Sequence, residues 1–150
     1  MARAGEEFPL DREAREALLR TAAECTFVWN ARDGWPVGVT MAYLWARERL
    51  WLFTGSDRPR VAAVRRDPRV SVVVRGPARS VTAKGRCTLR VDDDARGWAY
   101  AAFAARQAEL FPELIDAEAF GSRLARLERM ILEVAPEQWI SYDGTQAVLR

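Results

Sequence analysis

Four side chains with hydroxyl or guanidinium groups lie close together within residues 53–70. Thr54 ends an apolar run, Ser56 and Arg58 follow in a loop, and Arg60 opens a helical pattern. Hydroxyls, guanidinium groups and the free backbone N–H groups of a helix start are the donors that bind phosphate in proteins. The spacing therefore predicts an anion site of the phosphate-binding kind.

The arginine content of the chain leaves a second interpretation of this helix open. The chain has 23 Lys+Arg residues, and Lys84 is the only lysine among them. Arginine binds anions through two parallel hydrogen bonds, but abundant arginine and alanine also indicate codon bias in a GC-rich genome. The helix after Thr54 is then a solvated basic surface, and Arg65 and Arg66 are assigned to that surface under either interpretation.

The complete absence of histidine excludes several kinds of active site. Without imidazole there is no Ser-His or Cys-His nucleophile pair and no histidine-ligated zinc or non-haem iron centre. Any reaction must depend on carboxylates, on arginines or on a cofactor. We assign no catalytic side chain and no metal site, since the three aspartates at 92–94 are expected to cap the following helix.

Composition also bears on the binding partners of the protein and on the cellular compartment in which it is expected. The 21 acidic residues leave a net charge of +2, which does not indicate a nucleic-acid or membrane partner. The first residues include carboxylates where a signal peptide needs an apolar run, and no stretch has the length of a membrane span. We expect a cytoplasmic protein in which Cys25 and Cys87 are reduced core residues.

The hydrophobic pattern predicts a mainly β protein with α-helices. Period-two patterns predict six strands, at residues 25–31, 37–45, 50–54, 70–75, 81–91 and 130–134, and residues 136–142 close the domain. Helices are expected at 11–22, 59–67, from 92 onward and at 116–126, the third burying Ala95, Trp98, Ala102 and Ala105. Since the first three strands lack a crossover helix, we expect one domain, residues 1–150, forming an antiparallel closed or nearly closed barrel.

The order of these motifs resembles the pyridoxamine 5'-phosphate oxidase-like family of flavin-binding split barrels. The resemblance covers roughly Cys25 to Asp93, with the strand meander, the Thr54 loop, the arginine at the helix start, residues 65–74 and the strand with Lys84-Gly-Arg-Cys87, and it extends to the ending at 136–143. It implies a six-stranded antiparallel split barrel that binds FMN as a homodimer. It also implies an FMN-dependent oxidoreductase acting on a small molecule, with hydride transfer carried by the flavin.

The resemblance further assigns residues to the cofactor phosphate. Arg60 takes the place of the family's common lysine, and Thr54 supplies a hydroxyl at the end of the third strand. Arg58 lies close enough in the loop to assist, and Phe53 and Ser56 complete this part of the predicted site.

Other cofactor contacts implied by the resemblance come from two further strands. Val39, Thr40 and Met41 line the edge of the isoalloxazine ring. Arg79 and Ser80 approach the flavin from the partner subunit, with serine standing where the family's oxidases have glutamine.

The substrate is not identified by these motifs. The family's oxidases hold pyridoxamine phosphate with an arginine and a histidine, so a chain without histidine is not expected to oxidise that compound. Trp139 is a candidate wall of a substrate pocket, although tryptophans in strands more often belong to the core or to a dimer interface.

Three alternatives remain open. The same fold and phosphate site fit the deazaflavin coenzyme F-420 in place of FMN. A non-catalytic flavin or haem carrier is the second, and the missing histidine disfavours haem. A basic nucleic-acid module over residues 58–69 is the third, disfavoured because no aromatic residues are interleaved with its arginines.

Overall fold

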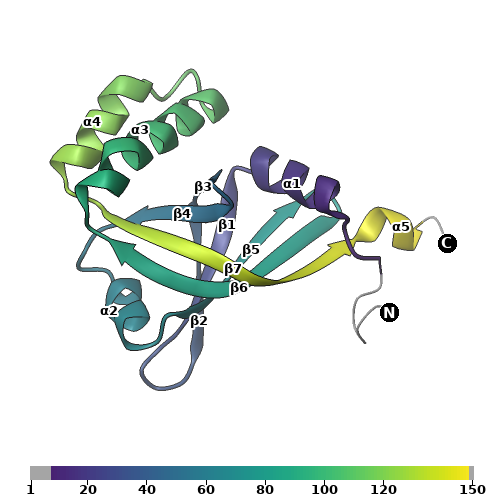
Figure 1. Ribbon diagram of the computed structural model, residues 1–150. Helices are drawn as coiled ribbons and strands as arrows, with labels where there is room; N and C mark the ends of the chain where they lie inside the picture. The colour runs from purple at the N-terminus through teal and green to yellow at the C-terminus, as the bar shows by residue number, and fades with distance from the viewer. Residues whose placement is uncertain (1–7, 149–150) are drawn as a thin grey trace.

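The computed structural model describes residues 8–148, and in this part of the chain the strands form one curled antiparallel sheet (Figure 1). Its strand order is β2-β1-β5-β6-β7-β4-β3. The strands are β1 Glu24–Asn30, β2 Pro36–Ala42, β3 Leu44–Ala46, β4 Arg49–Thr54, β5 Arg69–Gly76, β6 Arg79–Arg90 and β7 Met130–Asp143. The predicted class, a mainly β antiparallel barrel with helices, is confirmed, with seven strands in the described residues rather than six.

The connection between β2 and β3 explains why the sheet curls. These strands lie at the two edges of the sheet, yet only Tyr43 separates them in sequence. The edges must therefore meet, as in a split barrel. Tyr43 is buried and its hydroxyl donates to the Leu19 carbonyl at 2.6 Å. The prediction of one strand over residues 37–45 was wrong because the chain changes pairing partner at Tyr43, where β2 pairs with β1 and β3 pairs with β4.

The strand predicted at residues 81–91 has the expected alternation. Val81, Ala83, Gly85 and Cys87 are buried, and the side chains between them face outward. The expectation that Val91 continues the buried face was wrong, since β6 ends at Arg90 and Val91 is exposed. The predicted last strand and closing segment form one strand, β7, whose register with β6 shifts beside Gly85.

In the described residues, five helices flank the sheet: α1 Arg12–Thr21, α2 Pro59–Arg66, α3 Asp93–Leu110, α4 Ala117–Arg126 and α5 Gly144–Val148. Asp11, Asp92 and Asp116 accept the backbone N–H groups that begin α1, α3 and α4, so the capping role predicted for the aspartate run holds at Asp92. Within the described residues, no helix is long and apolar enough to cross a bilayer.

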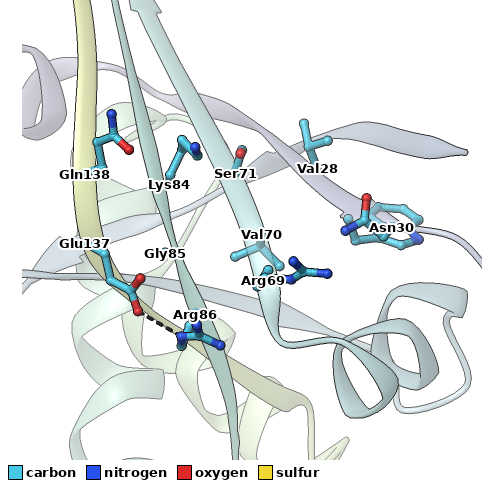
Figure 2. A pocket seen from close by; sticks show the side chains of 11 residues that line it. Val28, Asn30, Arg69, Val70, Ser71, Lys84, Gly85, Arg86, Glu137 and Gln138 are labelled. Atoms are coloured by element: carbon cyan, nitrogen blue, oxygen red, sulfur yellow. Dashed lines mark hydrogen bonds and ion pairs between the residues drawn. The ribbon is translucent and has the colours of Figure 1, made fainter. Parts of the chain in front are cut away.

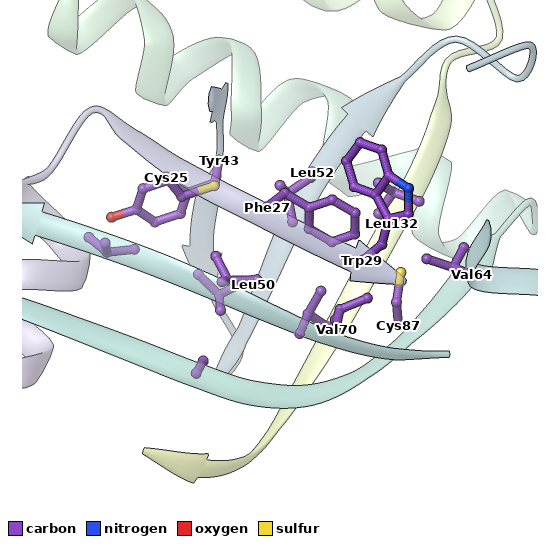
Figure 3. Packing of buried hydrophobic residues seen from close by; sticks show 14 of the residues in the cluster. Cys25, Phe27, Trp29, Tyr43, Leu50, Leu52, Val64, Val70, Cys87 and Leu132 are labelled. Atoms are coloured by element: carbon purple, nitrogen blue, oxygen red, sulfur yellow. The ribbon is translucent and has the colours of Figure 1, made fainter. Parts of the chain in front are cut away.

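The interior of the barrel is one cluster of aliphatic and aromatic side chains, including Phe27, Leu50 and Leu52 (Figure 3). Cys25 and Cys87 belong to this cluster as free thiols, as predicted. Burial raises the pKa of both thiols to about 12, so they remain protonated near neutral pH.

A second cluster joins the α3–α4 hairpin to the outside of β4 and β7, at one end of the sheet (Figure 1). The buried face of α3 includes Ala95, Ala99, Phe103 and Gln107, spaced four residues apart. The predicted face was therefore wrong beyond Ala95: Trp98 and Ala102 are half-buried and Ala105 is exposed.

A candidate phosphate-binding corner

The backbone between β4 and α2 places donors at a helix start. Arg58 is the N-cap of α2, its N–H donates to the Gly55 carbonyl at 3.2 Å, and Pro59 occupies the first turn. Proline suits this position because its ring fixes a helical φ and it lacks an N–H that would need a partner. The cap side chain carries no acceptor for the first-turn amides, so this helix start favours an anionic ligand.

Arg60 and Thr54 form the centre of this corner, which we define as Thr54, Ser56, Arg58 and Arg60. The Nη1 of Arg60 donates to Thr54 Oγ1 at 2.6 Å, and Thr54 is buried at the end of β4. The guanidinium lies 5.6 Å from the ring centre of Trp29. Its Nε is buried without a hydrogen-bond acceptor within residues 8–148.

The corner contains two guanidinium groups, and the carboxylate of Asp57 lies in the same loop. Within residues 8–148, neither Arg58 nor Arg60 takes part in an ion pair. Burial lowers the pKa of Arg60, and the nearby Arg58 lowers it further. Burial and the Arg58 charge both disfavour the protonated form of Arg60, and a phosphate dianion bound beside it would favour that form. Ser56 and Arg58 are exposed and free to turn toward such a ligand.

The far end of α2 differs from its start. Arg65 and Arg66 are both exposed, as predicted. Arg66 also donates from Nη2 to the Asn30 carbonyl at 2.8 Å, which joins α2 to β1. The two ends of this short helix are therefore chemically different.

The predicted flavin-edge residues lie on β2, the edge strand beside β1. Val39 pairs with Phe27, two positions along β1 from Trp29, which forms a wall of the corner. Val39 and Met41 face the core and are half-buried, whereas Thr40 faces outward and is exposed. The free edge of β2 thus runs along the same side of the barrel as Trp29.

Phe53 is not brought into the corner by its side chain. Its ring stacks on Phe103 of α3 with centroids 4.4 Å apart and also contacts Tyr100. Successive strand residues face opposite sides of a sheet, so Thr54 faces the corner and Phe53 faces α3. Only the backbone of Phe53 adjoins the predicted site.

Arg79 and Ser80 lie at the other end of the sheet from the corner. β5 begins next to α2, where Arg69 pairs with Arg86, and ends where Gly76 pairs with Arg79. Arg79 Nε donates to Asp143 Oδ1 at 3.2 Å. Within one chain, these two residues and the corner are therefore separated.

Sequence reasoning missed the role of Asp143. Its carboxylate is buried and also accepts the Thr145 hydroxyl at 2.6 Å. This hydrogen bond and the Arg79 guanidinium lower its pKa. Asp143 therefore fixes the position of Arg79, and no local motif connects two residues so far apart in sequence.

Trp139 likewise lies away from the corner. It packs edge-to-face against Trp45 beneath α1, with ring centroids 5.9 Å apart. The pocket that these two indoles line is considered below.

The outer face of the sheet carries a wide depression of about 600 Å³ (Figure 2). Lys84, Ser71 and Gln138 lie there side by side on neighbouring strands, and Arg86 pairs with Glu137 at 2.9 Å. The Lys84 ammonium has no partner within residues 8–148. Around this depression, cross-strand pairing aligns residues of five strands, β2, β1, β5, β6 and β7, in two rows. Lys84 is the one charged side chain in these two rows. The first row is Thr40, Thr26, Val73, Thr82 and Ile140, and the second is Gly38, Val28, Ser71, Lys84 and Gln138.

The curled antiparallel sheet and the arginine–threonine corner define a split β-barrel suited to a phosphate-bearing cofactor. A family model of pyridoxamine 5'-phosphate oxidase matches residues 10–143. The chain belongs to this family, as its motifs predicted. No curated protein matches the chain.

Several solved structures share the fold. The conserved hypothetical protein Rv2991 from Mycobacterium tuberculosis has a TM-score of 0.82 at 18% identity, covering 100% of this chain and 94% of that protein. A FAD-binding protein from Mesorhizobium loti has a TM-score of 0.63 at 20% identity, covering 88% and 93%. A protein named F420 reductase has a TM-score of 0.62 at 20% identity, covering 83% and 94%.

Proposed function

We propose that this protein is a cytoplasmic FMN-dependent oxidoreductase that works as a homodimer. The observation that carries the proposal is the Arg60–Thr54 pair, in which the Arg60 guanidinium takes part in no ion pair within residues 8–148. Membership of the pyridoxamine 5'-phosphate oxidase family and the fold shared with a FAD-binding protein support a flavin as the ligand.

Each residue of the corner has a defined task in this proposal. Arg60 binds the phosphate, and Thr54 fixes the direction of the guanidinium through the 2.6 Å hydrogen bond. Ser56 and Arg58 close over the phosphate from the loop. The free edge of β2 at residues 39–41 supports the ring. When bound, the flavin supplies the hydride chemistry, which agrees with a chain that has no histidine.

The proposed homodimer forms through the outer face of the sheet. Exposed strand faces are normally polar, but Ile140 and Tyr142 remain 42% and 43% exposed on this one. Lys84 is the one charged side chain in the two rows, so a second copy that packs on this face must offer its ammonium an acceptor or leave it in contact with solvent. Such a dimer supplies Arg79 and Ser80 to the partner's cofactor.

The proposed substrate is a small molecule other than pyridoxamine phosphate. Binding of that compound by the family's oxidases uses a histidine, and the chain has none.

Visible absorption of the purified protein tests the proposal, followed by mass analysis of the compound that heat releases. We expect a yellow protein that releases FMN. Release of the deazaflavin F-420 instead would favour the alternative that the shared fold with an F420 reductase supports. A colourless protein that binds neither compound on titration contradicts both. Substrate-dependent bleaching of the flavin distinguishes an enzyme from a non-catalytic carrier.

A further inference from the structure

A second pocket, of about 260 Å³, lies beneath α1 and shares no residue with the phosphate-binding corner. Three parts of the chain build it: the outward side of α1, the turn between β3 and β4, and the middle of β7. Its lining residues are Arg12, Arg15, Glu16, Trp45, Glu48, Arg49, Pro136 and Trp139.

Two indoles form the apolar walls of this pocket. The rings of Trp45 and Trp139 meet edge-to-face at 76°, and both residues are half-buried. The indole N–H of Trp45 donates to Glu16 Oε2 at 2.8 Å. This hydrogen bond fixes the orientation of one wall, so the aromatic surface is preorganised.

The charged groups of the pocket are balanced with one exception. Glu16 lies 3.7 Å from Arg20 Nε and already accepts the Trp45 N–H. The Glu48 carboxylate is 3.6 Å from Arg12, and Arg49 is 3.7 Å from Glu133. Arg15 is the exception.

The Arg15 guanidinium is a cation without an acidic partner. Its central carbon lies 4.5 Å from the ring centre of Trp139, in a cation–π contact. Its Nε is buried without an acceptor, and its side chain forms no hydrogen bond or ion pair within residues 8–148. Its two Nη groups form no hydrogen bond within residues 8–148 and are not among the buried unpartnered atoms, so they can donate to an acceptor that enters the pocket.

We propose that this pocket binds a small aromatic carboxylate. A carboxylate matches the planar fork of Arg15 and neutralises the unbalanced charge, while an aromatic ring packs against the indoles of Trp45 and Trp139. The volume is below that of pockets for drug-sized ligands, which indicates a ligand with a single ring. The proposal does not depend on which cofactor the corner binds.

Calorimetric titration with three probes tests the chemistry. Benzoate has both the charge and the ring, benzamide lacks the charge, and cyclohexanecarboxylate lacks the planar ring. We expect saturable binding of benzoate, with a Kd at least about tenfold lower than that of benzamide, as the loss of a charge-assisted hydrogen bond requires. Equal affinities for benzoate and benzamide, or no saturable binding of benzoate, overturn the proposal.

Matched variants test the location. Arg15→Gln is expected to weaken benzoate binding at least about tenfold and to remove the preference over benzamide, while Arg15→Lys retains that preference. Arg123→Gln, an exposed arginine on α4, changes the Kd by less than about twofold. Thermal unfolding shows whether each variant is folded. Equal losses in Arg15→Gln and Arg123→Gln, or competition between benzoate and FMN, assign the binding to another site.

Discussion

Replacing Arg60 by alanine should weaken FMN binding far more than any other single change on α2. The side chain donates to Thr54 at 2.6 Å, and this hydrogen bond holds its guanidinium in place before a ligand arrives. Arg65 is the matched control on the same helix, because it is exposed and has no side-chain partner within residues 8–148.

The magnitude follows from the kind of interaction that is lost. A hydrogen bond to a charged group contributes about 1.5–3 kcal/mol, so Arg60→Ala should raise the Kd for FMN about tenfold to a hundredfold. Arg60→Lys retains the charge but not the fork, and its loss should be smaller. Arg65→Ala should change the Kd by less than about twofold, since isolated exposed charges contribute little.

Titration of FMN into the apoproteins, followed by quenching of flavin fluorescence, measures these differences. Arg60→Ala also leaves the buried Thr54 hydroxyl without its donor, which should cost about 1 kcal/mol of stability. Thermal unfolding without FMN therefore has to show that each variant is folded. Equal increases in Kd for Arg60→Ala and Arg65→Ala would refute the reasoning, because α2 would then act only as a basic surface.

Three further predictions concern the core, the Arg79 ion pair and the outer face. Replacing Cys25 and Cys87 together by alanine should retain FMN binding in the same titration, because thiols with a pKa of about 12 stay protonated and act as small apolar groups; a folded double variant without binding contradicts this. Asp143→Asn should lower the melting temperature more at pH 7 than at pH 3. The pKa of Asp143 is lowered on folding, so its stabilisation is present above the unfolded-state pKa, about 3.9, and is lost as pH falls through the folded-state pKa; a pH-independent difference contradicts it. Ile140→Asp should sediment as a monomer, while Leu114→Asp, on an exposed loop, should remain a dimer like the parent; two dimeric variants would contradict the proposed interface.

The elements that the sequence predicts well are those whose signals are local. Strict alternation predicts β6, and Asp11, Pro59 and Pro68 correctly bracket α1 and α2. The break at Tyr43 is invisible because alternation continues through it, and a change of strand partner leaves no local mark. The buried face of α3 was displaced because its alanines fit several helical faces, and only packing against β4, β7 and α4 selects one.

In the candidate site too, contacts between residues close in sequence could be predicted, and contacts between distant residues could not. Thr54 and Arg60 are six positions apart on a strand end and the next helix, so their contact follows from one turn of chain. Trp29 reaches the same corner from β1, and Asp143 reaches Arg79 across β6 and β7, 64 positions away. Such pairs depend on sheet order and register, which a single sequence does not contain.

In the proposed homodimer, the two ends of the sheet would link assembly to cofactor binding. β5 has seven residue steps between Arg69 and Gly76, which separates the corner from the Arg79 end by roughly 20–25 Å within one chain. A two-fold axis lying in the interface and running across the strands reverses these ends, so that each corner faces the partner's Arg79 and Ser80. Ile140→Asp should therefore weaken FMN binding at concentrations where it is monomeric, although Ile140 belongs to neither end. A monomeric variant with unchanged FMN affinity would show that the corner binds the cofactor alone, and that Arg79 and Ser80 do not contribute.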